Sequence, residues 1–258
     1  MALYQLILAY DGTDFSGFQR QGNARTVQGT LESVLRELGW SEGAILFAGR
    51  TDAGVHASGQ VVTFTLDWQH SSANLVSALN ARLPSDVSVL KVEKAKAEFH
   101  PRYDASSRTY RYSIYHSAVR HPLCDRYAWR LWPELDVNRL QEITTIFHGR
   151  HDFSAFGRAM KPGNSTVREV KTSRWFMEGQ YLLYEVEANA FLYHMVRRLV
   201  YCQVQAARGR ISLEELVEGL ETGRKVHPGL APSCGLALVN VAYDGSRRGE
   251  VEKDENLD

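Results

Sequence analysis

Residues 44–66, AILFAGRTDAGVHASGQVVTFTL, contain two predicted strands joined by a loop with two widely spaced glycines. The apolar runs 44–48 and 60–66 are short, rich in β-branched and aromatic residues, and flanked by glycine, which is typical of buried strands. This strand pair is the centre of the first half of the predicted fold.

The elements on either side of this pair complete a recognisable order. The apolar run 3–10 (LYQLILAY) predicts a strand, and Thr26 is the predicted N-cap of an amphipathic helix that ends near Gly39. A helix over 72–83 and a strand over 87–92 follow the pair. The resulting order is β-α-β-β-α-β, as in ferredoxin-like domains.

The second half of the chain predicts the same order with one extra helix. Its elements are a strand at 109–115, a helix capped by Asp136, a hairpin of 167–177 and 181–188, helices at 191–207 and 212–220, and a strand at 236–243. We therefore expect an α+β protein of two tandem ferredoxin-like or RRM-like halves, with two antiparallel sheets and a central active-site cleft. The expected units are residues 1–104 and 105–245, followed by a flexible tail at 246–258.

Composition narrows the class of protein. The chain has 258 residues, of which 44% are hydrophobic and 23% charged, so it is neither disordered nor collagen-like. No run approaches the roughly 18 apolar residues of a membrane span. The N-terminus does not resemble a signal peptide, and three scattered cysteines indicate neither a disulfide framework nor a metal site. These features favour a soluble cytoplasmic protein.

Positive charge is concentrated locally although the net charge is zero. The basic stretches are Arg102, Arg108, Arg111, Arg120, Arg126 and Arg130; Arg150, Arg158, Lys161, Arg168 and Lys171; and Arg197, Arg198, Arg208 and Arg210. Arginine suits bidentate contact with phosphate and stacking on bases. From the residues alone, a track for nucleic acid and a set of scattered solvated side chains are equally good interpretations.

The loop between the first two quoted strands carries candidate chemistry. Gly49 and Gly54 permit unusual backbone angles, and between them lie the carboxylate of Asp52 and the guanidinium of Arg50. An ionised Asp can act as a nucleophile at a glycosidic carbon, and a neighbouring cation favours the ionised form. The competing interpretation is an Asx-turn in which Asp52 accepts a hydrogen bond from the backbone of Gly54.

Several motifs resemble those of the TruA-type tRNA pseudouridine synthases. They are GRTDAGVHASGQVV at 49–62, YDGTDFSGFQRQGNARTVQGTLE at 10–32, FHPR at 99–102, RTYRY at 108–112, NAFLYHMVR at 189–197 and GL at 235–236. The motifs follow one another in the family's order, and the resemblance extends over residues 3–243. It favours the catalytic interpretation of Asp52.

The resemblance implies a role for each of five residues. Asp52 corresponds to the family's nucleophile, Tyr110 to a tyrosine that stacks on uracil and helps to remove the C5 proton, and Leu236 to a leucine that packs on the base. Arg197 corresponds to the partner of the catalytic aspartate, and Arg50 is expected to face RNA. Because uracil is a stabilised leaving group, one carboxylate in a dry pocket suffices. No metal and no cofactor are implied.

Some residues fall outside this set. His56, His100 and His194 share no metal-ligand spacing, and we do not assign them catalytic roles. The sequence departs from the family pattern at Phe18, at Ala237 and in a longer loop before Arg158, which leaves the RNA contact of Arg158 in doubt.

Three functions follow from these observations. The first is an enzyme that isomerises uridine at positions 38, 39 and 40 of the tRNA anticodon stem-loop, working as a homodimer without a membrane or small-molecule partner. The second is a non-catalytic RNA-binding protein built from two RRM-like halves, although no RNP1-like stretch is present. The third, a nucleoside hydrolase, lacks a second acid near Asp52.

Overall fold

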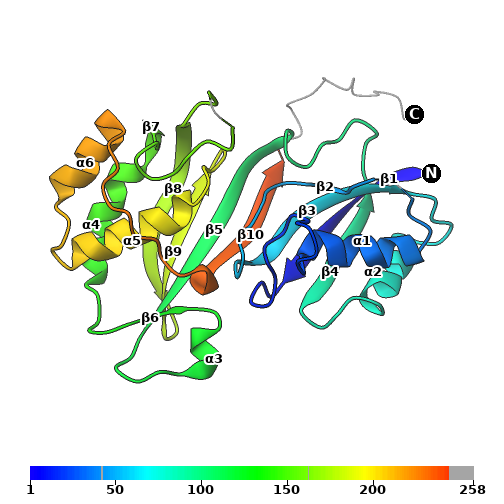
Figure 1. Cartoon of the computed structure of the whole chain (residues 1–258), viewed down its shortest axis with the longest axis horizontal. Coiled ribbons are helices and arrows are strands. Elements are labelled where there is room, and N and C mark those ends of the chain that lie inside the picture. Colours follow the sequence, from blue (N-terminus) through cyan, green and yellow to red (C-terminus); the bar gives the residue numbers. More distant parts are fainter. Residues whose placement is uncertain (42, 162, 244–258) are drawn as a thin grey trace, which may run out of the picture.

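The computed structural model describes residues 1–41, 43–161 and 163–243. These residues form one ten-stranded mixed sheet with helices packed along it (Figure 1). Its main path is β4-β1-β3-β10-β5-β9-β8-β7, with β2 paired to β3 and β6 paired to β5. The expected tail at 246–258 lies outside the described residues.

The first half has the predicted order of elements. Its elements are β1 (Ala2–Tyr10), α1 (Val27–Glu37), β2 (Leu46–Phe47), β3 (His56–Leu66), α2 (Ser72–Asn80) and β4 (Val87–Lys94). All strand pairs within it are antiparallel, in the spatial order β4-β1-β3-β2. The strand predicted over 44–48 is only two residues long.

The second half repeats this arrangement. Its elements are β5 (Ala105–His116), α3 (Pro122–Asp125), β6 (Trp129–Leu131), α4 (Val137–Thr144), η1 (Thr145–Phe147), β7 (Gly149–Asp152), β8 (Val167–Glu178), β9 (Tyr181–Ala188), α5 (Met195–Ala207), α6 (Leu213–Thr222), η2 (Ser233–Gly235) and β10 (Leu236–Tyr243). The order β10-β5-β9-β8 matches that of the first half, and β7 extends its edge. The proposed division between residues 104 and 105 falls at the start of β5 and remains a prediction.

The expectation of two separate antiparallel sheets is wrong. β10 lies parallel to β3, with Ala237 opposite His56 and Leu238 opposite Ala57, so the halves share one sheet. This joint exists because β2 pairs with β3 only around Val62 and Thr63, which leaves the first residues of β3 open. Figure 1 shows β10 lying between β5 and β3.

Local sequence explains where most helices begin. The Thr26 side chain accepts a hydrogen bond from Gly29 N, as an N-cap does, and Asp136 caps α4 in the same way. Ser212 and Glu215 form a capping box at the start of α6. The helix predicted over 191–207 begins only at Met195, because the preceding residues form an irregular loop.

The core lies between the sheet and the helices of both halves. On β1 the residues Tyr4, Leu6, Leu8 and Tyr10 alternate with less buried ones, which gives the strand one core face. Within the described residues, no helix is both long and apolar enough to cross a bilayer.

Candidate active site

The loop from Ala48 to Val55 lies at the joint between the halves, directly before the residues of β3 that pair with β10. The loop is held from the first half, because Phe18 N donates to Thr51 O at 3.1 Å and Gly54 N donates to Phe15 O at 3.3 Å. The Thr51 hydroxyl also lies 2.7 Å from the Tyr10 hydroxyl. The Asx-turn interpretation is wrong, since Gly54 N donates to Phe15 O instead.

Arg108 anchors the start of this loop. Its guanidinium donates to Ala48 O at 3.1 Å and also to the carbonyls of Ala105, Asn189 and Arg102. The side chain is buried, and burial lowers its pKa. Arg108 therefore belongs neither to an exposed track for RNA nor to a set of solvated side chains, so both interpretations of the basic stretches are wrong for this residue.

Other members of those stretches also have partners within the protein. Arg111 pairs with Glu185 at 2.8 Å, and Arg126 pairs with Asp11 at 2.8 Å. Other basic residues of these stretches are exposed: Arg102, Arg120, Arg130, Arg150, Arg158, Lys161, Lys171 and Arg210. The candidate RNA-facing charge is thus smaller than the sequence indicates.

Asp52 meets Arg197, which lies on the first turns of α5 in the second half. Arg197 Nη1 donates to Asp52 Oδ2 at 3.2 Å, and Arg197 Nε donates to Ala231 O at 2.8 Å, which fixes the guanidinium. The Asp52 side chain is 25% exposed and the Arg197 side chain 15% exposed. The carboxylate is therefore sheltered yet still accessible, and a guanidinium lies against one of its oxygens.

His194 contacts the same carboxylate oxygen. Its Nε2 lies 3.3 Å from Asp52 Oδ2, a contact that no sequence pattern around this histidine predicts. Burial lowers the pKa of His194, which favours the neutral ring. Both partners thus meet at Oδ2, and within the described residues Oδ1 has no protein donor.

Tyr110 lies on β5 beside the start of the loop. The ring is 8% exposed and meets Phe191 edge-on, with the ring centroids 5.0 Å apart. Its hydroxyl would lie 3.9 Å from a Cβ placed on Gly49. Burial, with a smaller contribution from the Asp52 charge, raises the pKa of Tyr110 to about 12. The phenol therefore carries its proton at neutral pH.

Leu236 and Arg50 occupy different environments. Leu236 is 6% exposed and opens β10 opposite Tyr112, next to the residues that join β3. Arg50 is exposed, and no ion pair of its side chain is found in the described part of the chain. Arg197, rather than Arg50, is the cation beside Asp52.

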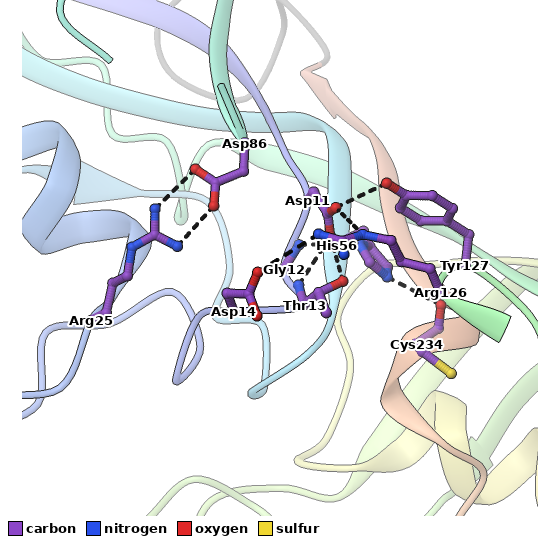
Figure 2. A network of polar contacts seen from close by, with 10 residues as sticks. All are labelled: Asp11, Gly12, Thr13, Asp14, Arg25, His56, Asp86, Arg126, Tyr127 and Cys234. Carbon is purple, nitrogen blue, oxygen red and sulfur yellow. Dashed lines mark hydrogen bonds and ion pairs between the residues drawn. The ribbon is translucent and has the colours of Figure 1, made fainter. Parts of the chain in front are cut away.

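The end of the loop is fixed by His56 (Figure 2). Gly12 N donates to His56 Nδ1 at 3.0 Å, so Nε2 carries the proton and donates to Cys234 O at 3.1 Å. Burial lowers the pKa of His56, in agreement with a neutral ring. His56 thus connects the loop after β1 with the segment that leads to Leu236.

Asp11 extends this network to the second half. The Asp11 carboxylate accepts hydrogen bonds from Arg126 Nε at 2.8 Å and from the Tyr127 hydroxyl at 2.9 Å. Burial alone would raise the pKa of Asp11, but hydrogen bonds from Thr13, Arg126 and Tyr127 hold it well below its usual range. A pocket of about 260 Å³ beside this network is lined by Tyr10, Asp11, His56 and Tyr127 among others, and it does not include Asp52. The central cleft remains a prediction.

Candidate metal ligands are not clustered in the described residues. No group of three His, Cys, Asp or Glu side chains there is arranged to hold an ion. Cys124, Cys202 and Cys234 are free thiols.

Comparison with known proteins gives the class first. The family model described as tRNA pseudouridine synthase matches residues 6–104 and 143–244. The matched segments include Asp52, Arg197 and Leu236, whereas Tyr110 lies between them.

 The chain is thus an isomerase that converts uridine to pseudouridine in tRNA.

Curated relatives then give the particular family. The chain is 35% identical to tRNA pseudouridine synthase A of Thermodesulfovibrio yellowstonii, over 94% of this chain and 100% of that protein. It is 40% identical to the protein of the same name from Chloroflexus aurantiacus, over 94% and 89%, and 37% identical to that from Moorella thermoacetica, over 94% and 100%. The chain belongs to the tRNA pseudouridine synthase A family. The interpretation as a non-catalytic RNA-binding protein is therefore set aside.

Proposed function

We propose that this tRNA pseudouridine synthase isomerises uridine at positions 38, 39 and 40 of the anticodon stem-loop, with Asp52 as its nucleophile. The observation that carries this assignment is the position of Asp52 at the joint of the two halves, where Arg197 holds one oxygen of its carboxylate at 3.2 Å. An anionic carboxylate with one oxygen fixed and the other free is suited to attack on an electrophilic carbon.

The proposed reaction needs no net gain or loss of atoms. The free oxygen of Asp52 attacks C1′ of the nucleoside and forms a bond to it as the bond between N1 and C1′ breaks. The uracil then turns while it stays bound. C5 then bonds to C1′, the Asp52 carboxylate is released, and the C5 proton is lost as N1 gains one. Arg197 stabilises the negative charge of the carboxylate before the attack and again when the carboxylate leaves.

Tyr110 is proposed to stack on the uracil and to take part in removal of the C5 proton. Because its pKa is raised to about 12, the phenol is protonated at neutral pH. Its oxygen can accept the C5 proton only while it passes its own proton on. The ring is held edge-on to Phe191, which limits its movement during this step.

The other two predicted residues have supporting roles in this proposal. Leu236 contributes an apolar surface that keeps water from the glycosyl-enzyme bond, and its burial at the joint supports this role. The exposed Arg50, two residues before Asp52, contacts RNA near the displaced nucleotide, since a paired base must leave its stack before C1′ can be reached.

The proposal extends to the assembly and location of the protein. By resemblance to its family, it works as a homodimer with one tRNA bridging both subunits. A cytoplasmic location agrees with the substrate named in its relatives.

An assay on unmodified tRNA transcripts tests the assignment. Wild-type protein is expected to convert uridine at positions 38, 39 and 40, whereas Asp52→Ala is expected to bind the same tRNA without converting it. Mapping pseudouridine by chemical modification and primer extension reads out each position separately. Equal conversion by both proteins would end the assignment of Asp52, and conversion elsewhere in the tRNA would end the assignment of the positions.

A further inference from the structure

His194 has an unusual backbone for its place in the chain. It is the residue before α5, and its φ of 66° is the only positive value of a non-glycine residue in the described chain. Residues with side chains adopt this left-handed conformation rarely, and they keep it where the surroundings over-determine it. Its side chain makes no capping hydrogen bond to α5. Helix capping therefore does not account for this conformation.

The conformation directs the imidazole to Asp52 instead. Nε2 lies 3.3 Å from Asp52 Oδ2, the oxygen that Arg197 also contacts at 3.2 Å. Arg197 approaches from the next turn of α5, three residues further on. The start of α5 thus places two side chains against a single oxygen: Arg197 donates a hydrogen bond to it, and the His194 ring nitrogen contacts it from a second direction.

A stack of side chains supports the imidazole from behind. The Tyr193 ring stacks on it, with centroids 3.7 Å apart and ring planes inclined by 26°, and the Arg158 guanidinium lies 4.7 Å from the Tyr193 ring centre. The backbones of Arg158 and Tyr193 are also bridged, since Tyr193 N donates to Arg158 O at 3.0 Å. The segments before Arg158 and Tyr193 pack closely against each other, because a Cβ on Gly157 would lie 2.6 Å from Leu192 Cβ.

From this geometry we infer that His194 is a positioning residue that orients the Asp52 carboxylate so that Oδ1 faces the substrate. This inference rests on the proposed function. Tyr193 and Arg158 complete the arrangement: the exposed Arg158 is available to RNA, and its stack on Tyr193 connects that contact with the orientation of Asp52. In this arrangement Arg197 stabilises the negative charge of the carboxylate, whereas His194 sets the direction in which the carboxylate points.

Substitutions at position 194 separate the imidazole from the backbone. Glycine adopts the left-handed conformation without strain, so His194→Gly removes the side chain while permitting the observed backbone. His194→Gln restores a donor at a similar distance along the side chain. We expect His194→Gly to lower the single-turnover rate at saturating tRNA about 10- to 100-fold, as small misplacements of reacting groups do. His194→Gln is expected to recover much of this loss.

The readout is the rate of conversion measured together with the Kd for tRNA. Positioning predicts a slower rate with an unchanged Kd, whereas a role in RNA binding would change Kd and leave the saturated rate intact. Thermal unfolding checks that each variant is folded, and His70→Gln, at an exposed histidine of the other half, is the matched control.

Two outcomes would overturn the inference: a His194→Gly protein as fast as wild type, or one whose only defect is in Kd. Asp52→Ala, assayed in parallel, distinguishes this failure from failure of the proposed function. If Asp52→Ala is inactive and His194→Gly is not impaired, only the role of His194 is wrong. If Asp52→Ala is active, the nucleophile itself is wrong.

Discussion

At the residue scale, the site depends on how one carboxylate is presented. Asp52 Oδ2 is held by Arg197, and Oδ1 is left without a protein donor in the described residues. A carboxylate presented in this way has one oxygen fixed by a guanidinium and a defined direction of attack. The surrounding loop is immobilised by hydrogen bonds from Phe18, Tyr10 and Arg108, so the geometry exists before the substrate arrives.

Tyr110 gives a prediction about the pH dependence of the rate. Because the Tyr110 pKa is raised to about 12, the fraction of tyrosinate stays small up to that pH. In the proposed step the protonated phenol is the working form, and nearly all of Tyr110 stays protonated between pH 7 and 9, so this group should leave the single-turnover rate of the wild type independent of pH over that range. A tenfold rise in rate per pH unit would instead indicate that the tyrosinate is the base. Tyr110→Phe should keep the Kd for tRNA and slow conversion about 10²- to 10⁴-fold, as loss of a proton-transfer group does. Full activity of Tyr110→Phe would contradict the proton-transfer role and leave stacking alone.

His56 gives a prediction about stability at acidic pH. Its ring is neutral in the folded state because burial lowers its pKa, whereas in the unfolded chain the ordinary value is about 6.5. Below about pH 6.5 the unfolded chain therefore binds a proton that the folded chain does not, and the free energy of unfolding falls as the pH falls. One such group contributes at most about 1.4 kcal/mol per pH unit.

Urea unfolding at several values between pH 7 and 5 measures this dependence. His56→Gln should unfold with a shallower dependence on pH over that range than the wild type. His70→Gln, at an exposed site, should keep the wild-type dependence. Identical pH dependence in His56→Gln and the wild type would show that His56 is not the neutral buried group inferred here.

The sequence identified some residues of the site and missed others. Asp52 and Arg197 lie 145 positions apart, and only the family resemblance paired them before the structure did. The contact of His194 with Asp52 could not be predicted, because it depends on a backbone conformation that no sequence pattern specifies. The burial of Arg108 could not be predicted from its basic stretch, since nothing local reveals that four carbonyls surround its guanidinium.

At the scale of elements, the joint between β3 and β10 brings the site together. The loop that carries Asp52 runs into β3, and the η2 turn that precedes Leu236 runs into β10. The backbones approach closely at Gly59, where an added Cβ would lie 2.3 Å from Val239 O. The absence of a side chain at this position therefore allows the two strands to lie side by side.

Gly59→Ala should weaken the joint. The new methyl group meets a backbone oxygen that cannot rotate away, so the strands must separate, at a cost of about 1–3 kcal/mol in the free energy of unfolding. Chemical denaturation of the variant measures this loss. Gly43→Ala is the matched control, since a Cβ there meets nothing within 4 Å and its cost should stay within about 0.5 kcal/mol. Equal stability of the two variants would contradict the close approach.

The order of elements was predictable, but the way the halves join was not. Apolar periodicity and caps such as Thr26 and Ser212 located the main strands and helices. The pairing of β10 with β3 involves two residues from each strand, which is too short a register for a sequence pattern to specify. The short β2, which leaves room for this pairing, was expected to be longer.

At the scale of the whole molecule, tRNA binding must rely on local rather than net charge. The net charge of the chain is zero, and several arginines pair with acidic residues of the same protein, as in Arg111–Glu185 and Arg126–Asp11. Phosphate contacts release counterions, so even a neutral protein that uses them binds RNA in a salt-dependent way.

Salt dependence measures the contribution of Arg50. If Arg50 contacts the tRNA backbone, Arg50→Ala should make the slope of log Kd against log salt concentration shallower by about 0.7–0.9. The matched control is Lys91→Ala, because Lys91 is already paired with Glu93 at 2.6 Å on the edge strand β4. An unchanged slope in Arg50→Ala, measured by filter binding, would place Arg50 away from the phosphates.

The most direct test of the account uses tRNA substituted with 5-fluorouridine. Fluorine at C5 cannot leave as a proton does, so an enzyme that bonds to the nucleotide through Asp52 should accumulate a stable protein–RNA adduct. Denaturing gel electrophoresis should show this adduct with the wild type and none with Asp52→Asn, which keeps the shape of the side chain but not its charge. An adduct of equal yield with Asp52→Asn would contradict the claim that the Asp52 carboxylate is the nucleophile.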